Sequence, residues 1–389
     1  SKAFPGSKWG ARASWYYWIN FPLWMASLAV MCPSLLTTIT GKEFGVLPAL
    51  VIELAFVWII TAIAFFPVCD SIIILNVSAA IKILLAVIVG VLGVYYVVKN
   101  GFVNDMSAGT FLPSFDLNSL SYISVIIFNL LGFEVVCTYS DSMSNPRKQI
   151  PQAIVVGGIV IAAIYLFSAF GIGAAIPADQ ISTDSGLLDA VSLITGKTGG
   201  LFIVAMALLF MITLFGNMIS WSMGVNSVAA YAAENGDMPK YFGKRWAKND
   251  MPIGAALANG IVATAVCLLG VVIDTYFPDS SLFWSFFALN LVMFLLSYLP
   301  VFPAFLKLRK SDPKTERPFR VPGGSGMLKL MVVVPMILIV VAVLFTAVPL
   351  SFDSETLSAT LPITIGSVVF ILLGEIMIAV RGKKDSSAQ

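Results

Sequence analysis

One charged residue lies deep inside an apolar stretch of this sequence, where charge is costly and usually functional. Lys82 stands about ten residues into the apolar stretch 72–98, which corresponds to about 15 Å along a helix. Its side chain cannot comfortably reach water over that distance, so we predict that the ammonium group faces the protein interior or a water-filled cavity. Because burial destabilises the charged form, such a lysine can exchange a proton near neutral pH. A permanently charged structural cation held by backbone carbonyls is the alternative.

A second candidate site lies in the stretch 121–139. Leu131, Gly132 and Phe133 are followed there by Glu134 and then by a run of polar residues, a pattern that predicts a helix broken between about Leu130 and Cys137. Irregular backbone at membrane depth is tolerated only where it lines a cavity or is buried in protein. A broken helix presents free N–H and C=O groups that can hold carboxylates and ammonium groups. The alternative is an ordinary kink at Gly132.

Two pairs of residues at helical spacing could line a binding pocket. Asn217 and Trp221 are four residues apart, as are Phe294 and Tyr298, so each pair shares a helical face. Aromatic residues on one face also occur in ordinary packing, which is the alternative for both pairs. Tryptophans near a membrane surface commonly serve as interface anchors, and this is part of the role that we expect for Trp9, Trp15, Trp18 and Trp24.

Several kinds of chemistry are excluded by composition. The chain has no histidine, so it has no histidine metal site, no Ser-His-Asp or Cys-His catalysis and no histidine proton relay. Its four cysteines are dispersed and read as small apolar residues. The HExxH and GxSxG motifs of membrane enzymes are absent, as is a channel filter motif. We therefore predict a protein that is not an enzyme and that needs no metal or cofactor.

The elements that position these residues are membrane helices. Of the 389 residues, 58% are hydrophobic and 11% are charged, whereas soluble proteins have about 25% charged residues. A membrane helix needs about 20 mostly apolar residues, and ten stretches qualify: 9–32, 46–66, 72–98, 121–139, 153–176, 198–232, 253–273, 281–306, 328–349 and 360–380. The fold class that we predict is an all-α membrane protein.

The basic residues predict how these helices are oriented. Eighteen of the 23 Lys and Arg lie at the two ends of the chain and in the even-numbered loops, whereas only Lys42, Lys99 and Lys197 lie in the others. Because basic loops stay in the cytoplasm, we predict cytoplasmic termini and the lipid bilayer as partner. The net charge of +2 provides no field for nucleic acid.

Two motifs carry a resemblance to a known family. Gly132-Phe133-Glu134 together with NPRKQIPQAI at 145–154 resembles the sixth-helix signature of amino acid permeases, in the amino acid–polyamine–organocation superfamily. KLRKSDP at 307–313 with ERPFRVPGG at 316–324 resembles the loop between helices ten and eleven of that family. Ser220-Trp221 leans toward the glutamate/GABA antiporter branch. Ser142 and Asn217 stand where acids occur in related sequences, which makes glutamate/GABA exchange itself doubtful.

The resemblance implies a LeuT-like fold of inverted repeats in a single transmembrane domain, 1–389. These permeases have twelve helices, and we expect the first two to be absent, so that the chain is N-terminally truncated. On this mapping 9–98 holds three helices of the first repeat, 121–306 the five of the second, 328–380 two C-terminal helices and 381–389 a cytoplasmic tail.

The resemblance also implies a function. It makes the chain a secondary transporter that moves amino acids or related amines across a bacterial plasma membrane by alternating access. Substrate-binding residues would be Leu131, Gly132, Phe133, Asn217, Trp221, Phe294 and Tyr298. Lys82, which matches a fifth-helix lysine of such permeases, would couple transport to protons. The alternatives are exchange without proton coupling and an inactive scaffold, and the oligomeric state is left open.

Overall fold

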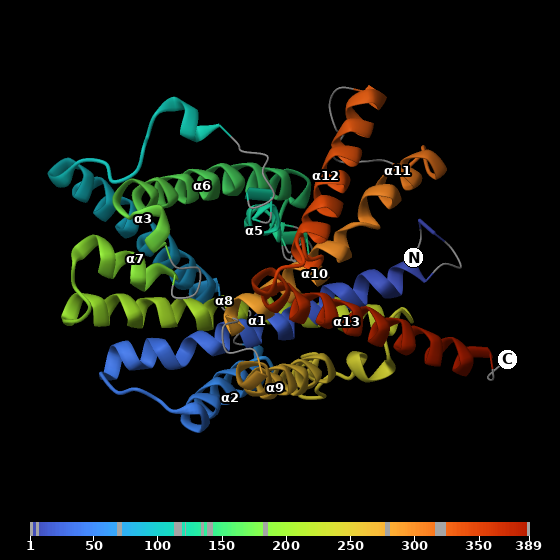
Figure 1. Ribbon diagram of the computed structural model, residues 1–389. Helices are drawn as coiled ribbons and strands as arrows, with labels where there is room; N and C mark the ends of the chain where they lie inside the picture. Colours follow the sequence, from blue (N-terminus) through green and yellow to red (C-terminus); the bar gives the residue numbers. More distant parts are fainter. Residues whose placement is uncertain are drawn as a thin grey trace.

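The protein is a bundle of long helices (Figure 1). The computed structural model describes residues 3–4, 8–67, 72–112, 119–120, 122–133, 136–137, 143–181, 186–276, 281–315 and 324–386, and no β-strand occurs in these ranges. The α-helices are α1 Trp9–Thr40, α2 Val46–Ile63, α3 Ile72–Asn100, α5 Ile123–Asn129, α6 Pro146–Ala175, α7 Gly186–Thr195, α8 Leu201–Glu234, α9 Ile253–Tyr276, α10 Leu282–Tyr298, α11 Val301–Ser311, α12 Gly324–Ala347 and α13 Ser354–Ser386. Short 3₁₀ helices lie at Ala108–Phe111, Ala178–Gln180 and Lys240–Gly243.

The all-α membrane architecture is confirmed. Within the described ranges, nine helices are long and apolar enough to cross a membrane, with α10 and α11 counted as one. They coincide with nine of the ten predicted stretches. The exception is the stretch 121–139, where the only α-helix among the described residues is the seven-residue α5. This stretch is the one in which the sequence predicts a broken helix.

Helix α1 is the centre of the bundle. It packs against α2, α8, α9 and α10, and Figure 1 shows it crossing the middle of the molecule with α2 and α9 on one side. The predicted end at residue 32 is wrong, because α1 continues through Pro33 to Thr40. It ends at Gly41, whose φ of +70° is a left-handed conformation that glycine adopts without strain.

Helices α3 and α6 are joined unusually closely. A side chain at Gly93 of α3 would overlap the backbone of Gly171 of α6, and a Cβ at Gly171 would lie 2.7 Å from the Gly90 Cα. Beyond α3, the Asn104 side chain donates to the Gly173 and Ile176 carbonyls at 2.7 and 2.6 Å. Small residues permit such close contact between membrane helices, and Asn104 fastens the same pair at one end.

Helix α13 is fixed to the start of α1. The Arg12 guanidinium donates to both Glu375 carboxylate oxygens, at 2.5 and 2.9 Å, and the Trp15 indole N–H donates to the Phe370 carbonyl at 2.9 Å. This bidentate pair holds the last helix of the chain against the central one.

Candidate functional site

The predicted break in the stretch 121–139 is present. Helix α5 ends at Asn129, and its last turn tightens, because Leu130 N–H donates to the Ile127 carbonyl at 2.9 Å and Leu131 N–H to the Phe128 carbonyl at 3.1 Å. Gly132 follows with a φ of +94°. The next α-helix along the described chain is α6, which begins only at Pro146. The acids expected in this segment, Glu134 and Asp141, lie outside the described residues, as do Ser142 and the motif at 316–323.

Aromatic side chains from four helices meet beside this break. The Trp221 ring of α8 lies 5.6 Å from the Phe294 ring of α10, and Tyr17 of α1 lies 6.3 and 5.8 Å from these two rings between centroids. Phe128, at the end of α5, lies 5.7 Å from Phe294. Further rings extend the group, and we call the whole set the aromatic cluster: Tyr17, Trp24, Phe128, Trp221, Phe287, Phe294 and Tyr298.

Gly132 brings the broken backbone against the aromatic cluster. A Cβ at this position would lie 3.4 Å from Cζ3 and 3.6 Å from Cη2 of Trp221. The positive φ of Gly132 is also one that other residues rarely adopt. Glycine at this position therefore permits both the backbone conformation at the break and the close approach of the backbone to the tryptophan ring.

The remaining predicted site residues divide into two groups. Trp221, Phe294 and Tyr298 lie together in the aromatic cluster. Phe133 points elsewhere, since its ring lies 3.5 and 4.0 Å from Cβ positions built on Gly157 and Gly158 of α6. Two others stand at the margin: Leu131 packs beside the small core of Leu295, Ile339 and Ala342, and Asn217 is half-buried one turn before Trp221.

Helix α1 contributes rings that the sequence did not point to. Tyr17 and Trp24 are seven residues apart and face Phe294 and Phe287, which are also seven apart. This spacing was a readable signal, but Trp24 had been interpreted as an interface anchor. Anchoring is wrong for Trp15 and Trp18, which are buried. Trp24 is half-buried in the aromatic cluster and Trp9 is 46% exposed, so for these two the anchoring role stays a prediction.

Lys82 lies apart from the aromatic cluster. It is exposed on α3, beside the exposed Ile83 and Leu84. One turn earlier, Ser78 lines an apolar groove of about 490 Å³ between α3 and α8. The prediction that the Lys82 ammonium group faces the protein interior is therefore not borne out among the described residues, and a water-filled cavity beside this face of α3 stays a prediction.

The groups around the break are aromatic rings, hydroxyls and backbone. In the part of the chain that the structure describes, no group of three or more Cys, Asp or Glu residues could hold a metal ion. The aromatic cluster offers π faces, the hydroxyl groups of Tyr17 and Tyr298, and the end of a broken helix beside them.

Comparison with known proteins identifies the family. A family model described as "Amino acid permease" matches residues 1–374. The chain belongs to the amino acid permease family. This permease is therefore a secondary transporter embedded in a membrane, as its sequence motifs indicated.

Relatives of this permease transport amines and amino acids. The probable agmatine/putrescine antiporter AguD of Lactococcus lactis subsp. lactis is 59% identical over 378 residues, which cover 97% of this chain and 80% of that protein. The putrescine transporter PotE of Haemophilus influenzae is 26% identical over 161 residues, 41% of this chain and 36% of that protein. The glutamate/gamma-aminobutyrate antiporter of L. lactis subsp. lactis is 22% identical over 242 residues, 61% of this chain and 47% of that protein.

Proposed function

We propose that this permease is an antiporter that exchanges small aliphatic amines, with agmatine and putrescine as its substrates. The observation that carries the proposal is the aromatic cluster beside the break at Gly132. Ammonium and guanidinium groups bind over aromatic faces within about 6 Å of the ring centre. The 59% identity to the probable agmatine/putrescine antiporter over nearly the whole chain supports the same substrates.

The make-up of the aromatic cluster favours amines over glutamate. A substrate carboxylate is usually held by a basic side chain or by helix N-terminal N–H groups, and none of the seven cluster residues is basic. The C-terminal end of α5, which carries Phe128 of the cluster, favours positive charge. A diamine can place one cation on the rings and the other at this helix end. Asn217 stands where glutamate/GABA antiporters carry an acid. This difference also argues against glutamate/GABA exchange.

The transport cycle follows from where the substrate sits. We propose that Gly132, Trp221, Phe294 and Tyr298 contact the substrate directly and that Leu131 and Asn217 shape the margins of the site. Phe133 packs against α6 instead. Access then alternates between the two membrane faces. On this proposal α1–α3 belong to the first inverted repeat, α5–α11 form the second and α12–α13 follow it. On this proposal both ends of the chain lie in the cytoplasm of a bacterial cell, which the excess of basic residues at the two ends and in the even-numbered loops supports. The substrate leaves chemically unchanged.

Exchange in liposomes tests the proposal. The intact transporter is reconstituted with internal agmatine, and uptake of labelled putrescine is measured. Loaded liposomes should accumulate label and unloaded ones should not, because an antiporter moves one substrate only against another. Trp221→Leu should weaken uptake, whereas Trp9→Leu, which changes an exposed tryptophan outside the cluster, should not. Equal uptake without internal substrate contradicts antiport, and exchange of glutamate for GABA contradicts the amine assignment.

A further inference from the structure

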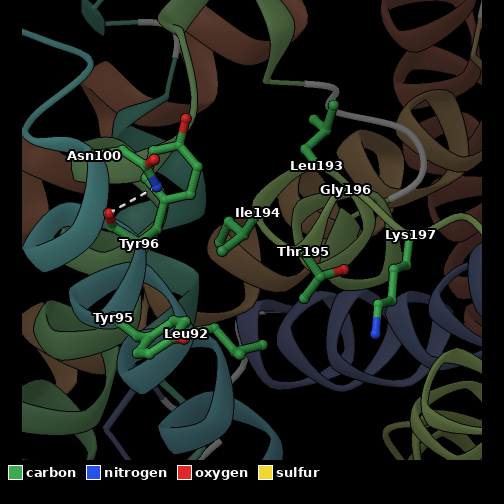
Figure 2. A pocket seen from close by; sticks show the side chains of 9 residues that line it. All are labelled: Leu92, Tyr95, Tyr96, Asn100, Leu193, Ile194, Thr195, Gly196 and Lys197. Atoms are coloured by element: carbon green, nitrogen blue, oxygen red, sulfur yellow. Dashed lines mark hydrogen bonds between the residues drawn. The ribbon is translucent and has the colours of Figure 1, made fainter.

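A second concave site lies far from the aromatic cluster, between the end of α3 and the end of α7. Figure 2 shows Tyr95 and Tyr96 of α3 on one side of it and Leu193, Thr195 and Lys197 at the end of α7 on the other. The cavity has a volume of about 480 Å³, which falls within the range of ligand pockets. Nothing in the proposed transport cycle uses it.

Two helix ends build the walls of this cavity. Helix α3 stops at Gly101, with φ +85°, whose N–H donates to the Val97 carbonyl at 2.8 Å. Helix α7 stops at Gly196, with φ +66°, and Lys197 N–H then donates to the Ser192 carbonyl at 3.2 Å. Such glycine caps fix how the chain leaves a helix. The turn at Gly196 therefore sets Lys197 at the rim of the cavity.

The charge at the rim is positive. Lys197 lines the cavity, and the Lys99 ammonium lies 4.7 Å from the centre of the Tyr95 ring, which is also in the lining. Two helix C-termini carry about −0.5 each, so the two lysines outweigh them by about one positive charge. None of the described residues that line the cavity is acidic. An anion is therefore favoured here and a cationic amine is not.

The concentration of charge is unusual for this face of the protein. Only three lysines fall in the loops that face away from the cytoplasm in the proposed orientation, Lys42, Lys99 and Lys197, and two of them flank this cavity. The positive-inside bias depletes that face of basic residues. Two lysines beside one cavity therefore make it the most basic place among these loops.

The surroundings of the cavity are apolar and exposed. Tyr95 and Leu193, which line the cavity, are both exposed. Val91 and Val98 of α3 share a helical face with Tyr95, four residues before it and three after it, and are exposed too, Val98 by 79%. In a membrane protein such side chains face lipid. Tyrosine and lysine beside them are typical of the level of the lipid head groups. A ligand that fits must therefore combine an anionic head with a hydrocarbon tail.

We propose that this cavity binds the head group of an anionic phospholipid in the outer leaflet. The phosphate accepts hydrogen bonds from the Lys197 ammonium and a tyrosine hydroxyl, and an acyl chain lies along the exposed valines of α3. The leaflet, but not the site, depends on the proposed orientation. We favour a lipid over a free anion because only a lipid also covers the exposed apolar side chains beside the cavity.

Titration of purified protein with defined lipids, followed by native mass spectrometry, tests this site. Phosphatidylglycerol should bind more tightly than phosphatidylcholine of the same chains. One lysine near an anionic head group is worth about fivefold in binding, so Lys197→Gln should weaken phosphatidylglycerol by about that factor and leave phosphatidylcholine unchanged. Lys42→Gln removes the third outward-facing lysine, which lies outside the cavity, and is the matched control. Equal weakening by both variants, or no preference between the lipids, overturns the proposal.

Two further arms separate the lipid from other ligands. Inorganic phosphate and putrescine are each added at millimolar concentration, and neither should displace phosphatidylglycerol. Displacement by phosphate identifies a simple anion site, displacement by putrescine a second amine site, and each outcome overturns the lipid assignment. If Lys197→Gln does not fold, Lys197→Arg keeps the charge and should retain binding, so that loss of binding by this variant also counts against the site.

Discussion

Gly132→Ala separates the two tasks of the glycine at the break. Its φ of +94° costs an alanine about 1–2 kcal/mol in backbone strain. The added methyl group would lie 3.4 Å from Cζ3 of Trp221, which is ordinary van der Waals contact, so the ring can stay in place. The methyl group instead takes up room beside the ring, at the edge of the space where we place the substrate.

The expected result is a loss of both stability and affinity. Thermal unfolding should show the backbone strain of about 1–2 kcal/mol. A cation–π contact is worth about 1–2 kcal/mol when desolvated, so its loss should raise the KM for putrescine exchange by about five- to thirtyfold. Because exchange and unfolding are measured on the same reconstituted protein, the two effects can be compared directly.

A matched control distinguishes strain from occupation of the site. Gly41 has a similar φ of +70°, and a Cβ there meets nothing within 4 Å. Gly41→Ala should therefore lose similar stability and keep its KM. If both alanine variants lose similar stability and both keep the wild-type KM, the break is not part of the binding site. Adding Trp221→Phe to Gly132→Ala completes a double-mutant cycle, and additive effects on KM would also refute the contact.

Three further predictions concern other parts of the bundle. Lys82→Met should fold and lose the pH dependence of uptake, while exchange persists. Unchanged proton-driven accumulation by this variant would favour a structural cation. Lys82→Arg, which is always charged, is the second variant. Asn290 is 0% exposed, and its amide has no hydrogen-bond partner among the described residues. Asn290→Leu should therefore raise the melting temperature, because an unsatisfied buried polar group costs about 1–3 kcal/mol of stability. A lower melting temperature would mean that the amide binds a partner. Gly93→Val should abolish folding or lower the melting temperature strongly, because its side chain would meet the Gly171 backbone, whereas Gly173→Ala, with nothing within 4 Å, should be tolerated; fluorescence-detected size exclusion distinguishes the two.

The sequence predicted the helices well because length and apolarity alone determine a membrane helix. The break was also readable, since Gly132 followed by a run of polar residues cannot form a continuous lipid-facing helix. The end of α1 was predicted one residue before Pro33, but the helix continues through this proline. Neighbouring helices can satisfy the backbone group that a proline leaves free. Helix α7 was missed because ten residues are too few to count as a span.

The partners of each ring could not be predicted. A helix that is apolar all round has no periodicity to say which face meets which neighbour, so nothing in the sequence indicates that Phe128 belongs to the aromatic cluster. Crossing angles and depths between helices distant in sequence determine such contacts. The i, i+7 spacing in α1 and α10 was the one usable signal, and only the observed packing gives it meaning.

The glycine contact between α3 and α6 has a mechanical consequence. Side chains between two helices can change rotamer and absorb a small displacement, but backbone in direct contact cannot. With Gly93 against Gly171 and Asn104 bonded across one end, α3 and α6 must move as one rigid lever. Helix α6 follows the broken segment in the chain, and α3 carries Lys82. Any swing that the substrate induces at the break therefore displaces Lys82 through the same lever, and the cation needs no contact with the substrate to respond to it.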